Sequence, residues 1–112
     1  MDATSRTEAH WLVLVTVPAP EDGERIGRVL VEERLAACVN VVPGLRSVYR
    51  WQGAVETAAE ALLLIKTTPA VFDRLAARVK ALHPYTLPEV VALPLAAGLS
   101  GYLAWIDEST RP

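Results

Sequence analysis

The stretch Leu35–Gly53, which reads LAACVNVVPGLRSVYRWQG, decides the fold of this 112-residue chain. Its segment Cys38–Trp51 reads as a strand but is too long for an ordinary one. Because proline cannot donate to a central ladder, Pro43-Gly44 predicts a bulge or bend inside this strand. Gln52-Gly53-Ala54 then turns the chain, and Val55–Thr67 returns as a second arm. The sequence therefore predicts one long β-hairpin.

The segments on either side of this hairpin alternate between strand and helix patterns. Short apolar runs indicate strands, and apolar stripes at helical spacing that follow a proline or glycine indicate helices. The predicted strands are His10–Val17 and Pro88–Pro94, and the predicted helices begin near Pro20, Pro69 and Gly98. The sum is an α+β ferredoxin-like β-α-β-β-α-β sandwich with a long central hairpin and an extra C-terminal helix. We expect this domain to span residues 10–108, between disordered tails at residues 1–9 and 109–112.

The composition limits the classes of protein to which the chain can belong. The formal net charge is −2 and the basic residues are scattered, which argues against a nucleic-acid binder. No apolar run approaches the roughly 20 residues of a membrane helix, and the polar N-terminus lacks the pattern of a secretory signal. A single cysteine excludes an internal disulfide, so we expect a cytoplasmic protein that acts without nucleic acid or membrane.

Linked motifs follow one another along the chain in the order LAACVN, PG, SVYRWQG, E-x-x-L-L-x-K-T, HPYTLPEVVALP and GYLAW. From Val13 to Ile106, this series resembles the CutA family of divalent-cation tolerance proteins. The resemblance implies the same ferredoxin-like fold and a homotrimer in which the long central hairpins pair across subunits. It also implies a part in the tolerance of divalent metals, copper(II) especially, through binding at clefts between subunits.

Metal ligands are the first candidates for chemistry in the chain. The thiolate of Cys38 and the imidazole of His83 suit copper or zinc, and a carboxylate such as Glu60 or Glu89 completes a ligand set. The alternative for Cys38 is a small buried core residue at the start of a strand. The alternative for His83 is a cap on the last carbonyls of the helix that Pro84 ends.

A second group of side chains is expected to line a ligand cleft or a subunit interface. Strand alternation places Glu60 and Lys66 on one face, where the lysine either holds an anionic ligand or forms an interface salt bridge. Tyr85 follows a His-Pro pair and is expected in a cleft. The other cleft candidates are Arg50 and Tyr49, and the trimer-interface candidates are Trp51 and Trp105.

The common catalytic signatures are absent from the sequence, which has no glycine-rich phosphate loop, Gly-x-Ser-x-Gly elbow or His-Glu-x-x-His motif. We therefore expect a binding protein without established catalysis. One alternative is a small-molecule or anion sensor that signals to an unidentified protein partner, because the trimeric form is also similar to the PII nitrogen-signalling proteins. The other is a hydrolase-type enzyme that uses Cys38 and His83 as a nucleophile pair.

Overall fold

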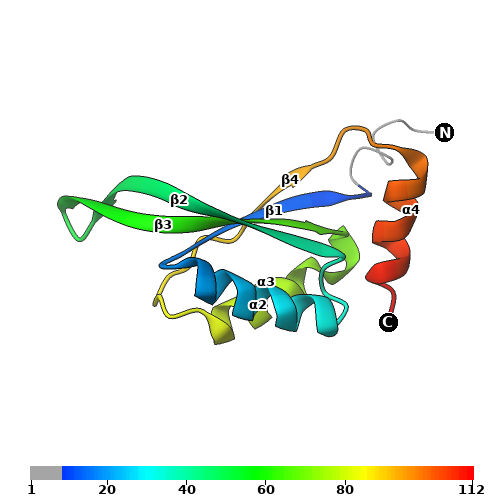
Figure 1. Cartoon of the computed structure of the whole chain (residues 1–112), viewed down its shortest axis with the longest axis horizontal. Coiled ribbons are helices and arrows are strands. Elements are labelled where there is room, and N and C mark those ends of the chain that lie inside the picture. The colour runs from blue at the N-terminus through cyan, green and yellow to red at the C-terminus, as the bar shows by residue number, and fades with distance from the viewer. Residues whose placement is uncertain (1–8) are drawn as a thin grey trace.

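A four-stranded antiparallel sheet carries helices α2 and α3 on one face in the computed structural model, which describes residues 9–112 (Figure 1). The strands lie in the order β2-β3-β1-β4. The elements are, in chain order, β1 (Trp11–Val17), α2 (Pro20–Glu32), β2 (Cys38–Trp51), β3 (Ala54–Thr67), the 3-10 turn η1 (Pro69–Val71), α3 (Phe72–Leu82), β4 (Val91–Pro94) and α4 (Ser100–Ser109). This order confirms the predicted ferredoxin-like arrangement with its extra C-terminal helix.

The β2-β3 hairpin contains both the predicted bulge and the predicted turn. The register of the two strands shifts between Val42 and Leu45, and Gly44 between them has a φ of 81°, which glycine adopts without strain. Gln52 and Gly53 turn the chain with φ angles of 51° and 84°. Two successive positive φ angles are typical of the type I′ turn, whose twist matches that of the flanking strands.

The hairpin is longer than the sheet that supports it. β1 pairs with β3 only from Ala61 to Thr67, so the half of β3 that precedes Ala61 pairs with β2 alone. This half of the hairpin projects from the rest of the fold (Figure 1). The molecule as a whole, hairpin included, is 48 Å along its longest axis. Val48 and Val55 lie on the projecting arms and are largely exposed. Apolar side chains and a strand edge are therefore open to a partner at this end.

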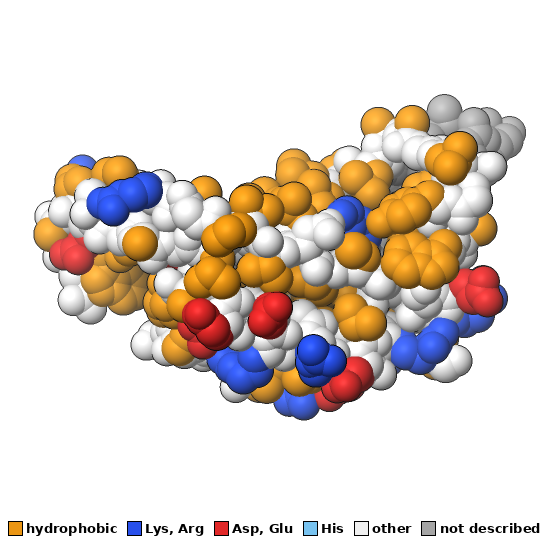
Figure 2. Space-filling view, in the orientation of Figure 1, with side chains coloured by type: hydrophobic (Ala, Val, Ile, Leu, Met, Phe, Trp, Pro, Cys, Tyr) orange, Lys and Arg blue, Asp and Glu red, His pale blue; other side chains and the backbone are white. Residues whose placement is uncertain are grey.

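The sheet has one covered face and one open face. Alternate residues of β1 and β3, such as Val13, Leu63 and Ile65, are fully buried in a core that they share with α2 and α3. The residues between them, Leu12 and Leu64 among them, point to the other face and are only half buried. Figure 2 shows hydrophobic side chains gathered along the sheet and onto α4.

The helices are short, and the last one extends past the predicted end of the domain. Within residues 9–112, no helix is long and apolar enough to cross a membrane. Helix α4 runs to Ser109, and the hydroxyl of the buried Thr110 donates to the carbonyl of Ile106. The C-terminal tail predicted for residues 109–112 is therefore shorter than expected, because Thr110 closes the helix. The tail predicted for residues 1–9 lies outside the described residues except for the exposed Ala9.

Candidate functional site

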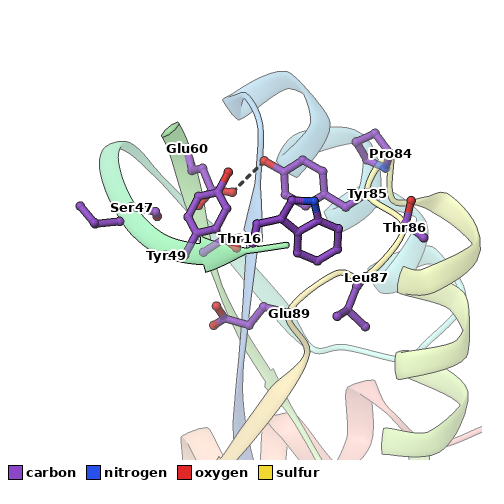
Figure 3. Close-up of a pocket in the computed structure, with 11 residues that line it drawn as sticks. Thr16, Ser47, Tyr49, Glu60, Pro84, Tyr85, Thr86, Leu87 and Glu89 are labelled. Carbon is purple, nitrogen blue, oxygen red and sulfur yellow. Dashed lines mark hydrogen bonds between the residues drawn. The ribbon is translucent and has the colours of Figure 1, made fainter. Parts of the chain in front are cut away.

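A cavity of about 710 Å³ opens where the projecting half of the hairpin leaves the sheet (Figure 3). Its walls come from the outer half of β2, from β3 and from the loop between α3 and β4. The side chains that carry chemistry are Tyr49 and Trp51 of β2, Glu60 of β3, and Tyr85 and Glu89 of the loop. Among the described residues, no lysine, arginine or histidine lines the cavity, so its charged side chains are carboxylates.

The Glu60 carboxylate is buried beside the cavity and is held by a hydroxyl group. Glu60 is 9% exposed, and the Tyr85 hydroxyl donates to its Oε2 at 2.7 Å, as the dashed line in Figure 3 shows. Burial raises the pKa of Tyr85 to about 12, and the hydrogen bond and charge of Glu60 act in the same direction. The phenol therefore keeps its proton at neutral pH. A buried carboxylate with a neutral donor favours a cation in its surroundings.

His83 fixes the loop that carries Tyr85. Its Nε2 lies 2.7 Å from the carbonyl oxygen of Thr16, and its Nδ1 accepts the backbone N–H of Tyr85 at 3.0 Å. Because a carbonyl oxygen only accepts, Nε2 carries the proton and Nδ1 provides the lone pair. Both ring nitrogens are thus engaged within the chain, and neither offers a lone pair to a metal in this conformation. The imidazole ties the loop to β1 rather than capping α3.

Cys38 lies at the opposite end of the β2-β3 ladder from the cavity. It pairs with Lys66, and the stretch of β3 between Lys66 and Glu60 is about 20 Å long at ~3.3 Å per residue. Burial raises the pKa of Tyr102 on α4, and the neighbouring Cys38 thiol adds to this effect. The predicted metal set is therefore divided, with Glu60 and Glu89 at the cavity and Cys38 away from it. Within residues 9–112, no three His, Cys, Asp or Glu side chains gather to hold a metal ion.

The predicted cleft residues are divided in the same way. Tyr49 and Tyr85 line the cavity, whereas Lys66 and Arg50 do not. The Lys66 ammonium instead donates to Asn40 Oδ1, and both residues lie on the open face of the sheet. An anion site that uses Lys66 would thus lie away from the cavity.

The two tryptophans predicted for a subunit interface are both partly exposed. Trp51 lines the main cavity, and Trp105 lines a smaller cavity of about 400 Å³ between α2 and α4. Their place in an interface stays a prediction. Each side chain is 43% exposed and leaves surface that a second chain or a ligand can cover.

Thr16 and Leu87 line the cavity as well, and neither was among the sequence candidates. The carbonyl of Thr16 also accepts from His83 Nε2, and a backbone carbonyl has no sequence signature. For Leu87, the available signal was a leucine in a polar, proline-flanked loop, HPYTLPE.

The chain matches one protein family over nearly its whole described length. The model of the family described as CutA1 divalent ion tolerance protein matches residues 11–109. The chain belongs to the CutA1 family. A curated CutA1 relative, the divalent-cation tolerance protein CutA of Thermus thermophilus, is 61% identical over 99 residues, which cover 88% of this chain and 96% of the relative. The chloroplastic CutA 1 of Oryza sativa is 50% identical over 111 residues, which cover 99% of this chain and 63% of the rice protein.

Solved structures of CutA1 proteins share the fold. The divalent cation tolerance protein of T. thermophilus gives a TM-score of 0.89 at 59% identity and is covered to 99%, against 91% of this chain. CutA1 from O. sativa gives a TM-score of 0.89 at 50% identity, with 92% of this chain and 94% of the rice chain covered. These structures confirm the predicted fold and the family to which the sequence motifs pointed.

Proposed function

We propose that this protein acts in the tolerance of divalent cations, as a homotrimer that binds a cation in the cavity of Glu60 and Glu89. The observation that carries the proposal is the buried Glu60 carboxylate, whose donor is the neutral Tyr85 hydroxyl. None of the ion pairs within residues 9–112 includes Glu60 or Glu89, so the cavity holds uncompensated negative charge. The T. thermophilus relative is a divalent-cation tolerance protein, which supports the same role here.

Copper(II), or another divalent metal, is the cation that we propose as cargo. Carboxylate oxygens are ligands for zinc and for harder divalent ions, and they also bind copper(II), so Glu60 and Glu89 fit this task. Two carboxylates are too few for a complete coordination sphere, and water or a neighbouring subunit would supply the remaining ligands. His83 contributes by holding Tyr85, and through it Glu60, in position.

The homotrimer is supported by apolar surface that one chain leaves uncovered. Val91 and Leu93 of β4 are each 49% exposed and pair with leucines of β1. The projecting hairpin exposes Val48 and Val55 as well. An apolar sheet face and an open strand edge favour association with another chain, and pairing of hairpins across subunits would cover both.

The two alternative functions have less support. A sensor of anions needs a basic group in its cleft, and none lines the cavity among the described residues. A hydrolase needs Cys38 beside His83, whereas the ladder register places Cys38 opposite Lys66 and both nitrogens of His83 are engaged. We therefore propose a binding protein rather than an enzyme, and we place it in the cytoplasm because its cysteine is free.

A calorimetric titration of the metal-stripped protein with copper(II) tests this proposal. We expect saturable binding at a fixed ratio per trimer, weakened at least about tenfold by Glu60→Gln or Glu89→Gln, because each change removes an ionised ligand. Glu24→Gln on the exposed side of α2 is the matched control and should keep full affinity. Binding that both cavity variants leave unchanged, or that Cys38→Ser abolishes instead, refutes the cavity as the site. A monomeric mass in solution refutes the trimer.

A further inference from the structure

The walls of the cavity indicate the chemical class of its ligand. We propose that the cavity binds a small organic ammonium ion, a proposal that rests on the cavity being the cation site of the proposed function. Three aromatic rings and two carboxylates line it, and among the described residues no basic side chain does so. This combination suits a cation that also has apolar surface.

The cavity is larger than a bare metal ion requires. Pockets for small molecules typically have volumes of about 300–1,000 Å³, and this cavity has a volume of about 710 Å³. Within residues 9–112 of one chain no three His, Cys, Asp or Glu side chains converge, so a metal ion here would take its remaining ligands, at about 2.0–2.6 Å, from water or a neighbouring subunit. A larger cation can contact the walls on several sides without such a ligand cage.

Aromatic rings from two separate segments line the cavity. Tyr49 and Trp51 come from β2, and Tyr85 comes from the loop after α3; in Figure 3 Glu60 lies beside the rings of Tyr49 and Tyr85. A cation over the face of such a ring is attracted by its quadrupole. Alkyl groups on the cation also pack against the rings, so an alkylated ammonium ion gains from both contacts. The hydroxyl of Tyr85 is already committed to Glu60, which keeps this ring in place.

The charges of the cavity favour a cation over an anion. Glu60 is 9% exposed and has no Lys, Arg or His partner within residues 9–112, and Glu89 adds a second negative charge. Asp22 lies near enough to raise the pKa of Tyr85, and its ion-pair partner Arg25 is exposed and does not line the cavity. An anion would therefore meet negative charge without a compensating positive charge from the described residues of the cavity wall.

Choline and its neutral carbon analogue 3,3-dimethyl-1-butanol test the proposal, because they have nearly the same shape and differ in charge. We expect calorimetry on the full chain to show choline binding at least about tenfold more tightly than the alcohol. Glu60→Gln, which keeps an acceptor for Tyr85, should weaken choline at least about fivefold and leave the alcohol unchanged. Trp51→Leu should weaken choline too, whereas Trp11→Leu, on a partly buried tryptophan of β1 that packs against Phe72 outside the cavity, is the matched control and should not.

Each outcome decides whether the cavity binds an organic ammonium ion, provided that a thermal melt shows every variant to be folded. Equal affinity for choline and the alcohol, or no saturable binding of choline, overturns the inference. Copper(II) binding that depends on Glu60, found together with no choline binding, overturns the inference and leaves the proposed function standing. The absence of both kinds of binding overturns both proposals, because the cavity is then not a cation site.

Discussion

The Tyr85 hydroxyl lies 2.7 Å from the Glu60 carboxylate and joins the loop after α3 to the base of the projecting hairpin. The two residues are 25 positions apart, and neither belongs to the hydrophobic core. His83 sets the position of the same loop through the carbonyl of Thr16 and the backbone N–H of Tyr85. The cavity is therefore shaped by the contacts that fasten this loop to the sheet, and its geometry depends on polar contacts rather than on core packing.

The change Tyr85→Phe measures the energy of this contact. It removes the hydroxyl and leaves the buried Glu60 carboxylate without this donor, which costs about 1–3 kcal/mol. We expect the free energy of unfolding in urea to fall by that amount. A double-mutant cycle with Glu60→Gln should give a coupling energy of about 0.5–3 kcal/mol. Strictly additive effects of the two changes would show that the hydrogen bond does not stabilise the fold.

Alkaline pH provides an independent test of the same residue. The pKa of Tyr85 is raised from its usual 10.0 to about 12 in the folded chain, chiefly by burial. The unfolded chain thus loses this proton at a lower pH, so the stabilisation is complete below pH 10 and is lost as the pH rises toward about 12. We expect urea unfolding across this window to show a smaller loss of stability in Tyr85→Phe than in the parent protein. If the stability of the two proteins fell in parallel as the pH rises, Tyr85 would not be the group whose raised pKa stabilises the fold.

Local sequence signals predicted most of the fold, because the residues at its turns have strong backbone preferences. The Pro43-Gly44 pair marked the bulge, and Gln52-Gly53 marked the turn, where positive φ angles are found. The strand predicted for Pro88–Pro94 is shorter than expected. Only Val91–Pro94 has a partner in β1, and the pairing partner, rather than local apolar character, decides where a strand begins.

The site was less predictable, because its residues meet through tertiary contacts. Residue type made Tyr49 and Glu60 candidates, but no sequence pattern indicates that they share a cavity with each other. Cys38 and His83 were grouped by their chemistry as metal ligands. The strand register places Cys38 opposite Lys66, and hydrogen bonds to backbone atoms engage both nitrogens of His83. Residue type therefore predicts candidates, and register and backbone contacts decide which of them meet.

Gly27 tests how closely α2 packs against β2. A Cβ at this position would lie 3.1 Å from both Cβ and Cγ1 of Val39, and Val39 Cβ moves only with the backbone of its strand. Overpacking of this kind costs about 1–3 kcal/mol, which offsets the gain of about 1 kcal/mol that alanine has over glycine in a helix. We expect Gly27→Ala to lower the thermal midpoint.

Gly101→Ala on α4 is the matched control for Gly27→Ala, because a Cβ there would meet nothing within 4 Å. It should keep or raise the thermal midpoint, since the helix propensity of alanine acts there without a steric penalty. A Gly27→Ala protein as stable as Gly101→Ala would contradict the close approach of α2 to β2.

The open face of the sheet gives the test of assembly. Leu93 is 49% exposed in one chain and lies opposite Leu12 of β1. If this face lies between subunits, Leu93→Asp places an unpaired carboxylate in the interface, and the loss of its hydration opposes association. We expect the sedimenting mass to fall from that of a trimer to that of a monomer, while circular dichroism shows the secondary structure intact.

Ala77→Asp is the matched control for this test, because Ala77 is exposed on α3, among the helices rather than on the open face. Its mass should remain that of a trimer, since a carboxylate there stays hydrated. If Leu93→Asp also remains trimeric, the open face lies outside the interface, and the projecting hairpin is the next surface to test. Val48→Asp on the projecting arm should then separate the subunits, because this arm has exposed apolar side chains and an open strand edge.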